Sequence, residues 1–365
     1  MLDRGLYVHI PFCIKKCRYC DFVSFTSGDK REYLSALKKE MKKYNGEKIN
    51  TVFIGGGTPT SLESSDLYDL FEFIGKNFRI NENYEWTVEM NPKTFDREKL
   101  LMMKEAGVNR VSVGVQSFCD GELEIIGRVH NSSEAKEAIS VTRDIFPDFN
   151  IDLMSALPGQ SIESFISSLN TALSFSPTHI SCYSLILEEG TELNRMNEKG
   201  MLDLPDEDSE RKMYETAKRL LEENGYKRYE ISNFAKPGFE CMHNLKYWNC
   251  DEYIGAGLAA HSYIDGVRYA NTSCMKNYIE GKTEEERIIL TANDMKSEYI
   301  IMSLRLANGI DETEYQRRFK SNLYDEYGDV IDKYIKYGLL ERKGSNYSLT
   351  DDGISVSNTV MCEFV

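Results

Sequence analysis

Short apolar runs alternate with longer polar, periodic stretches over the first two-thirds of the chain. The longer stretches, such as KREYLSALKKEMKKY and SIESFISSLNTALSF, have the apolar spacing of amphipathic helices. Strand and helix signals that alternate six times predict parallel βαβ units, which a closed barrel or an open sheet would satisfy equally. The runs are rich in β-branched and aromatic residues and cover residues 6–12, 51–56, 86–92, 110–117, 149–158 and 179–187.

The alternation stops near residue 225, and the chain after it has a different character. Residues 226–293 are rich in aromatic residues, Gly and Asn, which predicts an irregular segment, and long ordered loops are uncommon unless they are functional. From residue 294 onward, helical patterns precede a hairpin signal at Gly344-Ser345, which predicts a small, mainly helical, winged-helix-like domain. We therefore expect three parts, at residues 1–225, 226–293 and 294–365.

Composition and charge exclude several classes of protein. The 365 residues are 41% hydrophobic and 28% charged, as in an ordinary globular protein, with no apolar run of membrane-spanning length and no signal-peptide pattern. We therefore expect a cytoplasmic protein. A net charge of −15 argues against long-range attraction to nucleic acid or anionic lipid. Residues 295–365 carry 9 Lys and Arg against 12 Asp and Glu, so we do not expect the winged-helix pattern to bind DNA.

Three of the nine cysteines lie close together, as Cys13, Cys17 and Cys20 in the spacing C-x3-C-x2-C. Four interpretations compete. A zinc site would need a fourth ligand, for which His9 is the nearest candidate. A redox pair would use Cys17 and Cys20 and leave Cys13 idle. Fortuitous clustering is the third. The fourth is a [4Fe–4S] cluster held by three thiolates, which leaves one iron open to another ligand.

Unusual chemistry follows nearly every predicted strand. The cysteines follow the first strand, and GGGTPT, EMNP, GVQSF and DLMSALPGQ follow the next four. Because ligands of parallel α/β folds bind beyond the carboxyl ends of the strands, these segments should converge on one site. The glycines at 55–57 allow a close backbone approach to a ligand, and the Glu89 carboxylate suits ribose hydroxyls.

The cysteine spacing at the end of an early strand, with Tyr19 inside it, strongly resembles the radical SAM superfamily. This resemblance implies a partial parallel (β/α)6, TIM-like barrel. It implies a [4Fe–4S] cluster whose free iron binds S-adenosyl-L-methionine (SAM), and chemistry that proceeds through a 5′-deoxyadenosyl radical. It also implies an electron donor such as flavodoxin or ferredoxin.

Within the superfamily, the segments YVHIPFC, FIGGGTPT, RVSVGVQSF, GRVH and NIDLMSALPGQ resemble one branch. It contains the oxygen-independent coproporphyrinogen III oxidase HemN and its relative HemW. The C-terminal part also fits. Weaker matches fall on Ser184 and His261, where the side chains differ from those of the oxidase. The resemblance implies that the cluster is held by Cys13, Cys17 and Cys20, and that the other ligand contacts are Tyr7, Tyr19, Gly56, Gly57, Thr58, Glu89, Gln116, Arg128 and Asp152.

Three features separate the sequence from the oxidase and resemble the HemW heme chaperones. Phe22 stands where the oxidase has a fourth cysteine, and only six residues precede Tyr7 where the oxidase has a long leader. The segment HNLKYW (243–248) resembles the HNxxYW motif of HemW. In a flexible loop, the His243 imidazole suits an axial iron ligand, with Cys241 as its rival, and Tyr247 and Trp248 offer apolar faces to a macrocycle.

The function implied is a heme chaperone that binds SAM and delivers heme to an acceptor protein. The alternative is an oxidase that decarboxylates porphyrinogen propionates by radical chemistry. Lys15, Lys16, Arg18 and Arg128 provide local positive charge for a carboxylate-bearing ligand in an acidic protein. We expect no binding to nucleic acid, and peripheral contact with a membrane only through the acceptor.

Overall fold

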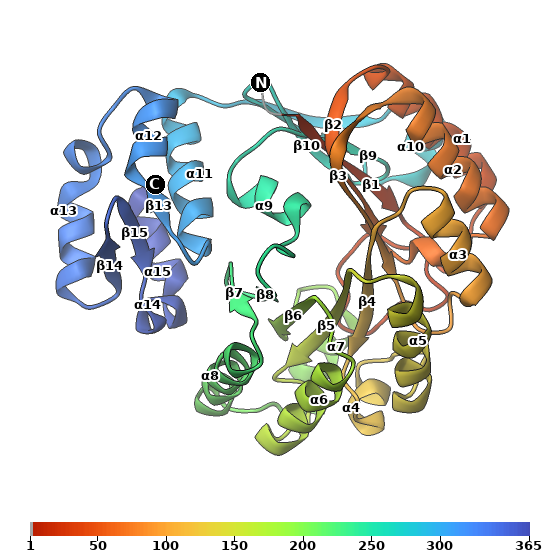
Figure 1. Cartoon of the computed structure of the whole chain (residues 1–365), viewed down its shortest axis with the longest axis horizontal. Coiled ribbons are helices and arrows are strands. Elements are labelled where there is room, and N and C mark those ends of the chain that lie inside the picture. Colours follow the sequence, from red (N-terminus) through yellow and green to blue (C-terminus); the bar gives the residue numbers. More distant parts are fainter. Residues whose placement is uncertain (1–2) are drawn as a thin grey trace.

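The computed structural model describes residues 3–365, and a curved sheet of parallel strands lies at its centre (Figure 1). Its first six strands follow the six predicted runs and pair in chain order, each parallel to the next. The predicted α/β fold with a parallel sheet is confirmed. These strands are β1 (Arg4–Ile10), β2 (Lys48–Gly56), β3 (Arg79–Met90), β4 (Arg110–Gln116), β5 (Phe149–Ser155) and β6 (His179–Ser184).

Helices that connect the strands cover the outer face of the sheet (Figure 1). Their buried apolar residues join those of the strands in one large core, and β4 is buried at every residue because both of its faces are covered. The helices are α1 (Lys30–Met41), α2 (Ser64–Asn77), α3 (Arg97–Glu105), α4 (Asp120–Ile125), α5 (Ser132–Ile145), α6 (Ile162–Ser174), α7 (Glu192–Glu198) and α8 (Glu207–Glu223), with 3-10 turns at Lys42–Tyr44 and Pro59–Ser61.

Residues 226–293 are more ordered than the sequence pattern suggested, so the expectation of an irregular segment is wrong. Within residues 3–365 the sheet has 12 strands, in the order β12-β11-β10-β9-β1-β2-β3-β4-β5-β6-β8-β7. Glycines interrupt the apolar pattern that would otherwise mark these strands. One of them, Gly255, is required by close packing, because a Cβ there would lie 1.8 Å from the His261 carbonyl oxygen of the returning chain. The elements are β7 (Lys227–Arg228), β8 (Asn233–Ala235), α9 (Met242–Trp248), β9 (Tyr253–Ala256), β10 (His261–Ile264), β11 (Val267–Asn271), α10 (Met275–Ile279) and β12 (Glu284–Ile289).

The C-terminal part has a second hydrophobic core of its own, formed by residues between 299 and 364. Its helices pack around a small sheet of order β13-β15-β14, whose hairpin turns at Gly344-Ser345 as predicted. The exact domain boundaries stay a prediction. The elements are α11 (Ala292–Arg305), β13 (Ile310–Asp311), α12 (Glu312–Phe319), α13 (Leu323–Lys336), β14 (Leu340–Lys343), β15 (Asn346–Leu349), α14 (Asp351–Ser355), α15 (Ser357–Met361) and a 3-10 turn at Cys362–Phe364.

Two features of the fold bear on function. In Figure 1, α9 lies between the concave side of the sheet and the C-terminal part, and it contacts both β2 and α11. Among residues 3–365, no helix combines the length and the apolar character that crossing a bilayer requires.

Candidate cofactor site

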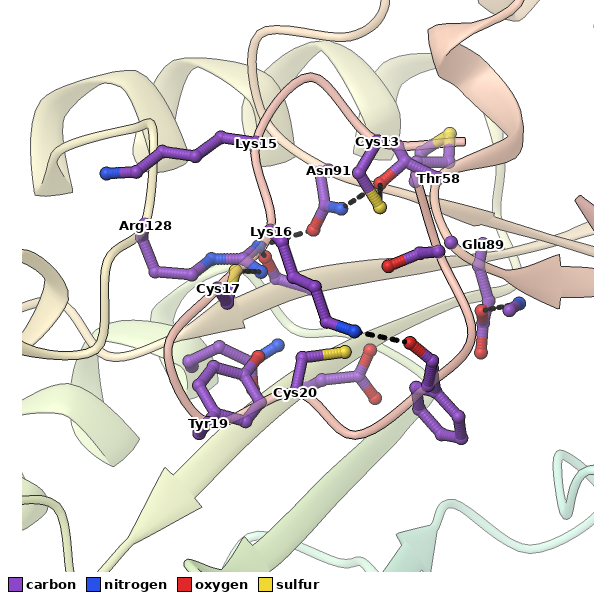
Figure 2. A pocket seen from close by; sticks show the side chains of 18 of the residues that line it. Cys13, Lys15, Lys16, Cys17, Tyr19, Cys20, Thr58, Glu89, Asn91 and Arg128 are labelled. Carbon is purple, nitrogen blue, oxygen red and sulfur yellow. Dashed lines mark hydrogen bonds between the residues drawn. The ribbon is translucent and has the colours of Figure 1, made fainter. Parts of the chain in front are cut away.

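A cavity opens at the carboxyl ends of the parallel strands, where the loops after β1 to β4 meet (Figure 2). The structure therefore brings together most of the residues that the sequence singled out, because parallel strands present their carboxyl ends at one edge. The expected site residues that line the cavity are Cys13, Cys17, Tyr19, Cys20, Gly56, Gly57, Thr58, Glu89, Gln116, Arg128 and Asp152.

The three cysteines lie on a loop that leaves β1 and is closed at its base by the backbone. The Cys13 amide donates to the Phe25 carbonyl (2.9 Å), and the Phe25 amide donates to the Pro11 carbonyl (2.8 Å). Inside the loop, the Cys20 amide donates to the Cys17 carbonyl (3.3 Å). All three thiols are free and half-buried, so the loop presents them to the cavity without a disulfide between them.

Burial disfavours ionisation of the Cys13 and Cys20 thiols, and neighbouring donors partly offset this effect. Burial raises the pKa of the Cys13 thiol, and it raises the pKa of Cys20 to about 11. The Arg128 guanidinium donates to the Cys17 sulfur (3.4 Å), and the Thr58 hydroxyl donates to the Cys13 sulfur (3.6 Å). Because metals bind the thiolate form, a cationic group beside Cys17 favours ligation at this loop.

The geometry separates two of the interpretations that the sequence left open. His9, the candidate fourth zinc ligand, has both ring nitrogens engaged: Nε2 donates to the Val23 carbonyl (2.9 Å), and Nδ1 accepts from the Tyr7 hydroxyl (3.0 Å). Within residues 3–365, no three His, Cys, Asp or Glu side chains are close enough to hold a single metal ion. A [4Fe–4S] cluster takes each thiolate on a different iron, so the three thiols fit a cluster better than one zinc.

Glycines after β2 allow the two neighbouring loops to approach closely. A Cβ on Gly56 would lie 2.3 Å from the His9 ring, and one on Gly57 would lie 2.7 Å from the Ile10 carbonyl oxygen. Gly56 also has a φ of 99°, which residues with side chains rarely adopt. Since the Gly57 amide donates to the Ile10 carbonyl (2.9 Å), the glycine loop is fixed against the end of β1 and its backbone faces the cavity.

Two carboxylates face the cavity from β3 and β5. Glu89 accepts from the Gly56 amide (3.0 Å), and burial, with repulsion from Asp152, raises the pKa of Glu89 to about 7. Burial also raises the pKa of Asp152, which accepts from the Ser112 hydroxyl (3.0 Å) and the Asn150 amide (2.7 Å). A ligand that carries an amino group or hydroxyls would satisfy these carboxylates.

Arg128 is a cation of the cavity wall that is held by several acceptors. Its guanidinium donates to Asn91 Oδ1 and to the Gly114 carbonyl as well as to Cys17, and its Nε is buried without a partner. Gln116, at the end of β4, has a φ of 74°, which is strained for a residue with a long side chain. Such strain is typical of ligand sites, where the surrounding structure enforces it.

The expected ligand set left out other residues that line the cavity. Asn91 is the most connected of them, because its Nδ2 donates to the Thr58 hydroxyl (2.7 Å) while its Oδ1 accepts from Arg128. The E-x-N-P motif at a strand end was a signal for Asn91. Period-two alternation along β4, from Ser112 to Gly114 and Gln116, was a signal for a lining strand. The residues left out are Lys15, Lys16, Phe22, Ser24, Met90, Asn91, Ser112, Gly114, Met154 and Tyr183.

Three residues of the expected ligand set do not reach this cavity. Tyr7 lies below it, with its hydroxyl on His9 and its ring stacked on Phe53 (6.2 Å between centroids). Ser184 donates its hydroxyl to Glu210. His261 is exposed in β10, so the two weak matches stay unsupported by the geometry.

The expectation of a flexible loop at residues 243–248 is wrong, because these residues belong to helix α9. His243 is fully buried, and its ring nitrogens contact the Thr51 hydroxyl (2.8 Å) and the Tyr247 hydroxyl (2.8 Å). Burial lowers the pKa of His243 to about 3, which keeps the ring neutral. With both nitrogens occupied in the interior, His243 has no position free for a heme iron.

The rival ligand Cys241 is equally inaccessible. It is fully buried, donates its thiol to Glu85 (3.3 Å), and burial raises its pKa to about 12. Glu85 also accepts from the His243 amide (3.0 Å), so one carboxylate of β3 holds the start of α9 in the interior. Of the expected heme contacts, Trp248 lines a cavity, and that cavity is a different one.

Known proteins resemble both parts of the chain. Residues 7–172 match the radical SAM superfamily, and residues 290–356 match the HemN C-terminal domain. Proteins named heme chaperone HemW are 38% identical in Bacillus subtilis, covering 99% of both chains, and 32% identical in Escherichia coli, covering 98% and 97%. The chain belongs to the HemW family of radical SAM proteins. HemW of Lactococcus lactis is 35% identical over 98% of this chain and 96% of its own.

The solved structure of coproporphyrinogen III oxidase (HemN) from Escherichia coli has the same fold. It superposes with a TM-score of 0.86 at 23% identity and covers 99% of this chain and 90% of its own. The HemW family thus shares the oxidase architecture, and membership in the radical SAM superfamily implies a [4Fe–4S] cluster and SAM. Three free thiols, a cation beside one of them and a glycine-lined cavity fit that pair. When bound, the cluster and SAM supply one-electron radical chemistry.

We predict that Cys20→Ser abolishes the broad visible absorbance and most of the bound iron after anaerobic reconstitution, because a cluster site loses one of its three thiolates. Cys274→Ser is the matched control, since Cys274 is exposed and lies outside the cavity. Four irons per chain retained in Cys20→Ser would contradict a cluster at this loop.

Glu89→Gln should stabilise the cofactor-free protein more at pH 8 than at pH 6. The folded-state pKa of Glu89 is raised to about 7, so its contribution to stability is present at low pH and is lost as pH rises through 7. The Gln substitution therefore restores at most about 3 kcal/mol of the free energy of unfolding. Urea unfolding measures it, with exposed Glu82→Gln of the same strand as control. An equal effect of Glu89→Gln at both pH values would contradict the buried carboxylate.

His243→Ala should lower the free energy of unfolding by about 2–4 kcal/mol, because it empties a buried site and leaves the Thr51 hydroxyl unpaired. Tyr247→Phe, which removes only one hydroxyl, should cost about 1 kcal/mol. Chemical denaturation compares the two variants. A His243→Ala protein as stable as wild type would show that His243 is not an interior residue in solution.

Proposed function

We propose that this protein is a heme chaperone that binds heme and delivers it to acceptor hemoproteins, with a [4Fe–4S] cluster and SAM in its cofactor site. The observation that carries the proposal is similarity at 32–38% identity to proteins named heme chaperone HemW along 98–99% of the chain. Because the match includes the C-terminal part, the inference does not rest on the cofactor domain alone.

In the proposed cofactor site, the cysteine loop holds the cluster and the opposite wall holds SAM. Gly56 and Gly57 would meet the methionine group through their backbones, while Glu89 and Asp152 would accept from amino or hydroxyl groups. Arg128 remains the candidate for a ligand carboxylate, since its planar guanidinium suits a bidentate pair. These assignments are supported by the shared cavity and by the chemistry of the side chains.

Coproporphyrinogen oxidation is the second candidate, because the fold of the solved HemN oxidase spans 99% of this chain. Position 22 weighs against it. Phe22 lines the cavity and is 60% exposed, so an apolar ring stands where the oxidase pattern expects a cysteine. The fold alone does not carry the activity of the oxidase to this protein.

We also propose an acidic electron-donor protein, such as a flavodoxin or ferredoxin, as a partner at the cavity mouth. Lys15 and Lys16 are exposed there and line the cavity, within a chain whose net charge is −15. A local basic patch beside the cysteine loop would steer an acidic donor toward the cluster.

The deciding experiment uses the reconstituted full chain under anaerobic conditions. We expect saturable binding of hemin, transfer of the bound heme to an apo-hemoprotein, and no decarboxylation of coproporphyrinogen III in the presence of SAM and a reductant. Absorbance spectra follow the heme, and chromatography follows the porphyrins. Conversion of coproporphyrinogen III without hemin binding would replace the chaperone proposal with the oxidase.

A further inference from the structure

A second cavity lies between α9, α11 and the C-terminal end of the chain, and it shares no residue with the cofactor cavity. Figure 1 shows α9 between the sheet and α11, and α9 contacts α11. Its walls combine aromatic, aliphatic and sulfur-containing side chains with one cation. The residues that matter for its chemistry are Trp248, Ile301, Met302, Arg305, Met361 and Cys362.

Trp248 connects this cavity to the HNLKYW segment. Residues four apart on a helix share a face, which is why His243 and Tyr247 meet in the interior. Trp248 is five residues beyond His243, so it projects about 140° around the helix, toward α11. Its indole is half-buried, and its N–H is buried without a hydrogen-bond partner.

Arg305, on the last turn of α11, is a cation without a charged partner in contact. Its guanidinium stacks over the Trp248 ring at 4.6 Å, and its Nε is buried without a hydrogen-bond partner. Within residues 3–365, none of the ion pairs includes Arg305, although its charge helps to lower the pKa of Glu230, a fully buried carboxyl. The Arg305 guanidinium thus lies in the cavity wall without an ion pair, where its positive charge suits a ligand that carries a carboxylate.

The remaining walls restrict what that ligand is. Ile301, Met302 and Met361 provide an apolar surface, and Cys362 contributes an exposed thiol at the rim. A ligand that uses all of these groups has a flat apolar body, at least one carboxylate and a metal with affinity for sulfur. Among the molecules that the proposed function involves, heme has all three properties.

We propose that heme docks in this cavity, with its face on Trp248 and the neighbouring apolar side chains, a propionate on Arg305, and Cys362 as an axial ligand of the iron. This inference rests on the proposed heme-chaperone function and assigns its cargo site. In this site the HNLKYW segment contributes its last residue, Trp248, while His243 stays in the interior.

The test titrates hemin into the full chain and records the Soret band. Cys362→Ala should shift the Soret band, and Arg305→Gln should weaken hemin binding roughly tenfold, the loss expected for a charge-assisted hydrogen bond. Hemin dimethyl ester, which lacks the carboxylates, should bind both the wild type and Arg305→Gln alike. Arg287→Gln is the matched control, because Arg287 also stacks on an aromatic ring, Tyr269, at 5.0 Å, but lies outside the cavity.

A second measurement avoids substitutions altogether. Hemin should protect Cys362 from alkylation, while Cys274, the other exposed cysteine, should react at an unchanged rate. Wild-type protein that binds no hemin would remove the proposed function itself. Wild-type protein that binds hemin, with unprotected Cys362 and both variants unchanged, would overturn only this site.

Discussion

The imidazole of His9 fills the space that a side chain at position 56 would occupy, and the cofactor site depends on this close packing. On one side, His9 Nε2 holds the Val23 carbonyl of the cysteine loop at 2.9 Å. On the other side, the backbone of Gly56 lies close to Glu89, whose carboxylate accepts a hydrogen bond from the Gly56 amide. One contact between neighbouring strands therefore positions the cysteine loop, the glycine loop and the Glu89 carboxylate. Any side chain at residue 56 would separate them.

Charge in this site is arranged around the same framework. Glu89 and Asp152 are held with little solvent, which raises the pKa of both carboxyls, while the Arg128 cation lies against Cys17 and contacts Asn91 and Gly114 at the strand ends. A cavity that presents both a cation and carboxylates suits a ligand that carries both charges, as SAM does. Each of these buried charged groups lowers the stability of the cofactor-free protein. A ligand that pairs with them removes this cost, which favours binding of the cluster and SAM.

Helix α9 relates the two cavities to each other. Its first residues are fixed by Glu85 from β3, and His243 stacks on Phe53 of β2 at 5.3 Å, the same ring that Tyr7 stacks upon. Its last residue, Trp248, packs under Arg305 of α11. A rigid helix thus spans from the floor of the cofactor barrel to the proposed heme cavity. The proposed site lies outside the barrel, where a protein that passes heme onward has to expose it.

The sequence by itself determined the parallel fold and most of the cofactor cavity. Short apolar runs rich in β-branched and aromatic residues mark strands locally, and parallel strands must end at one edge, so the pattern alone was enough to group the cysteine loop, the glycines at 55–57 and Glu89. The sequence could not place residues 243–248. A helix of seven residues has too few turns for a readable period, and its stability comes from distant partners, Thr51 and Glu85. Only the tertiary structure decided that His243 is interior, and only it brought residues 248, 301–305 and 361–362 around one cavity, because contacts between such distant segments leave no local pattern.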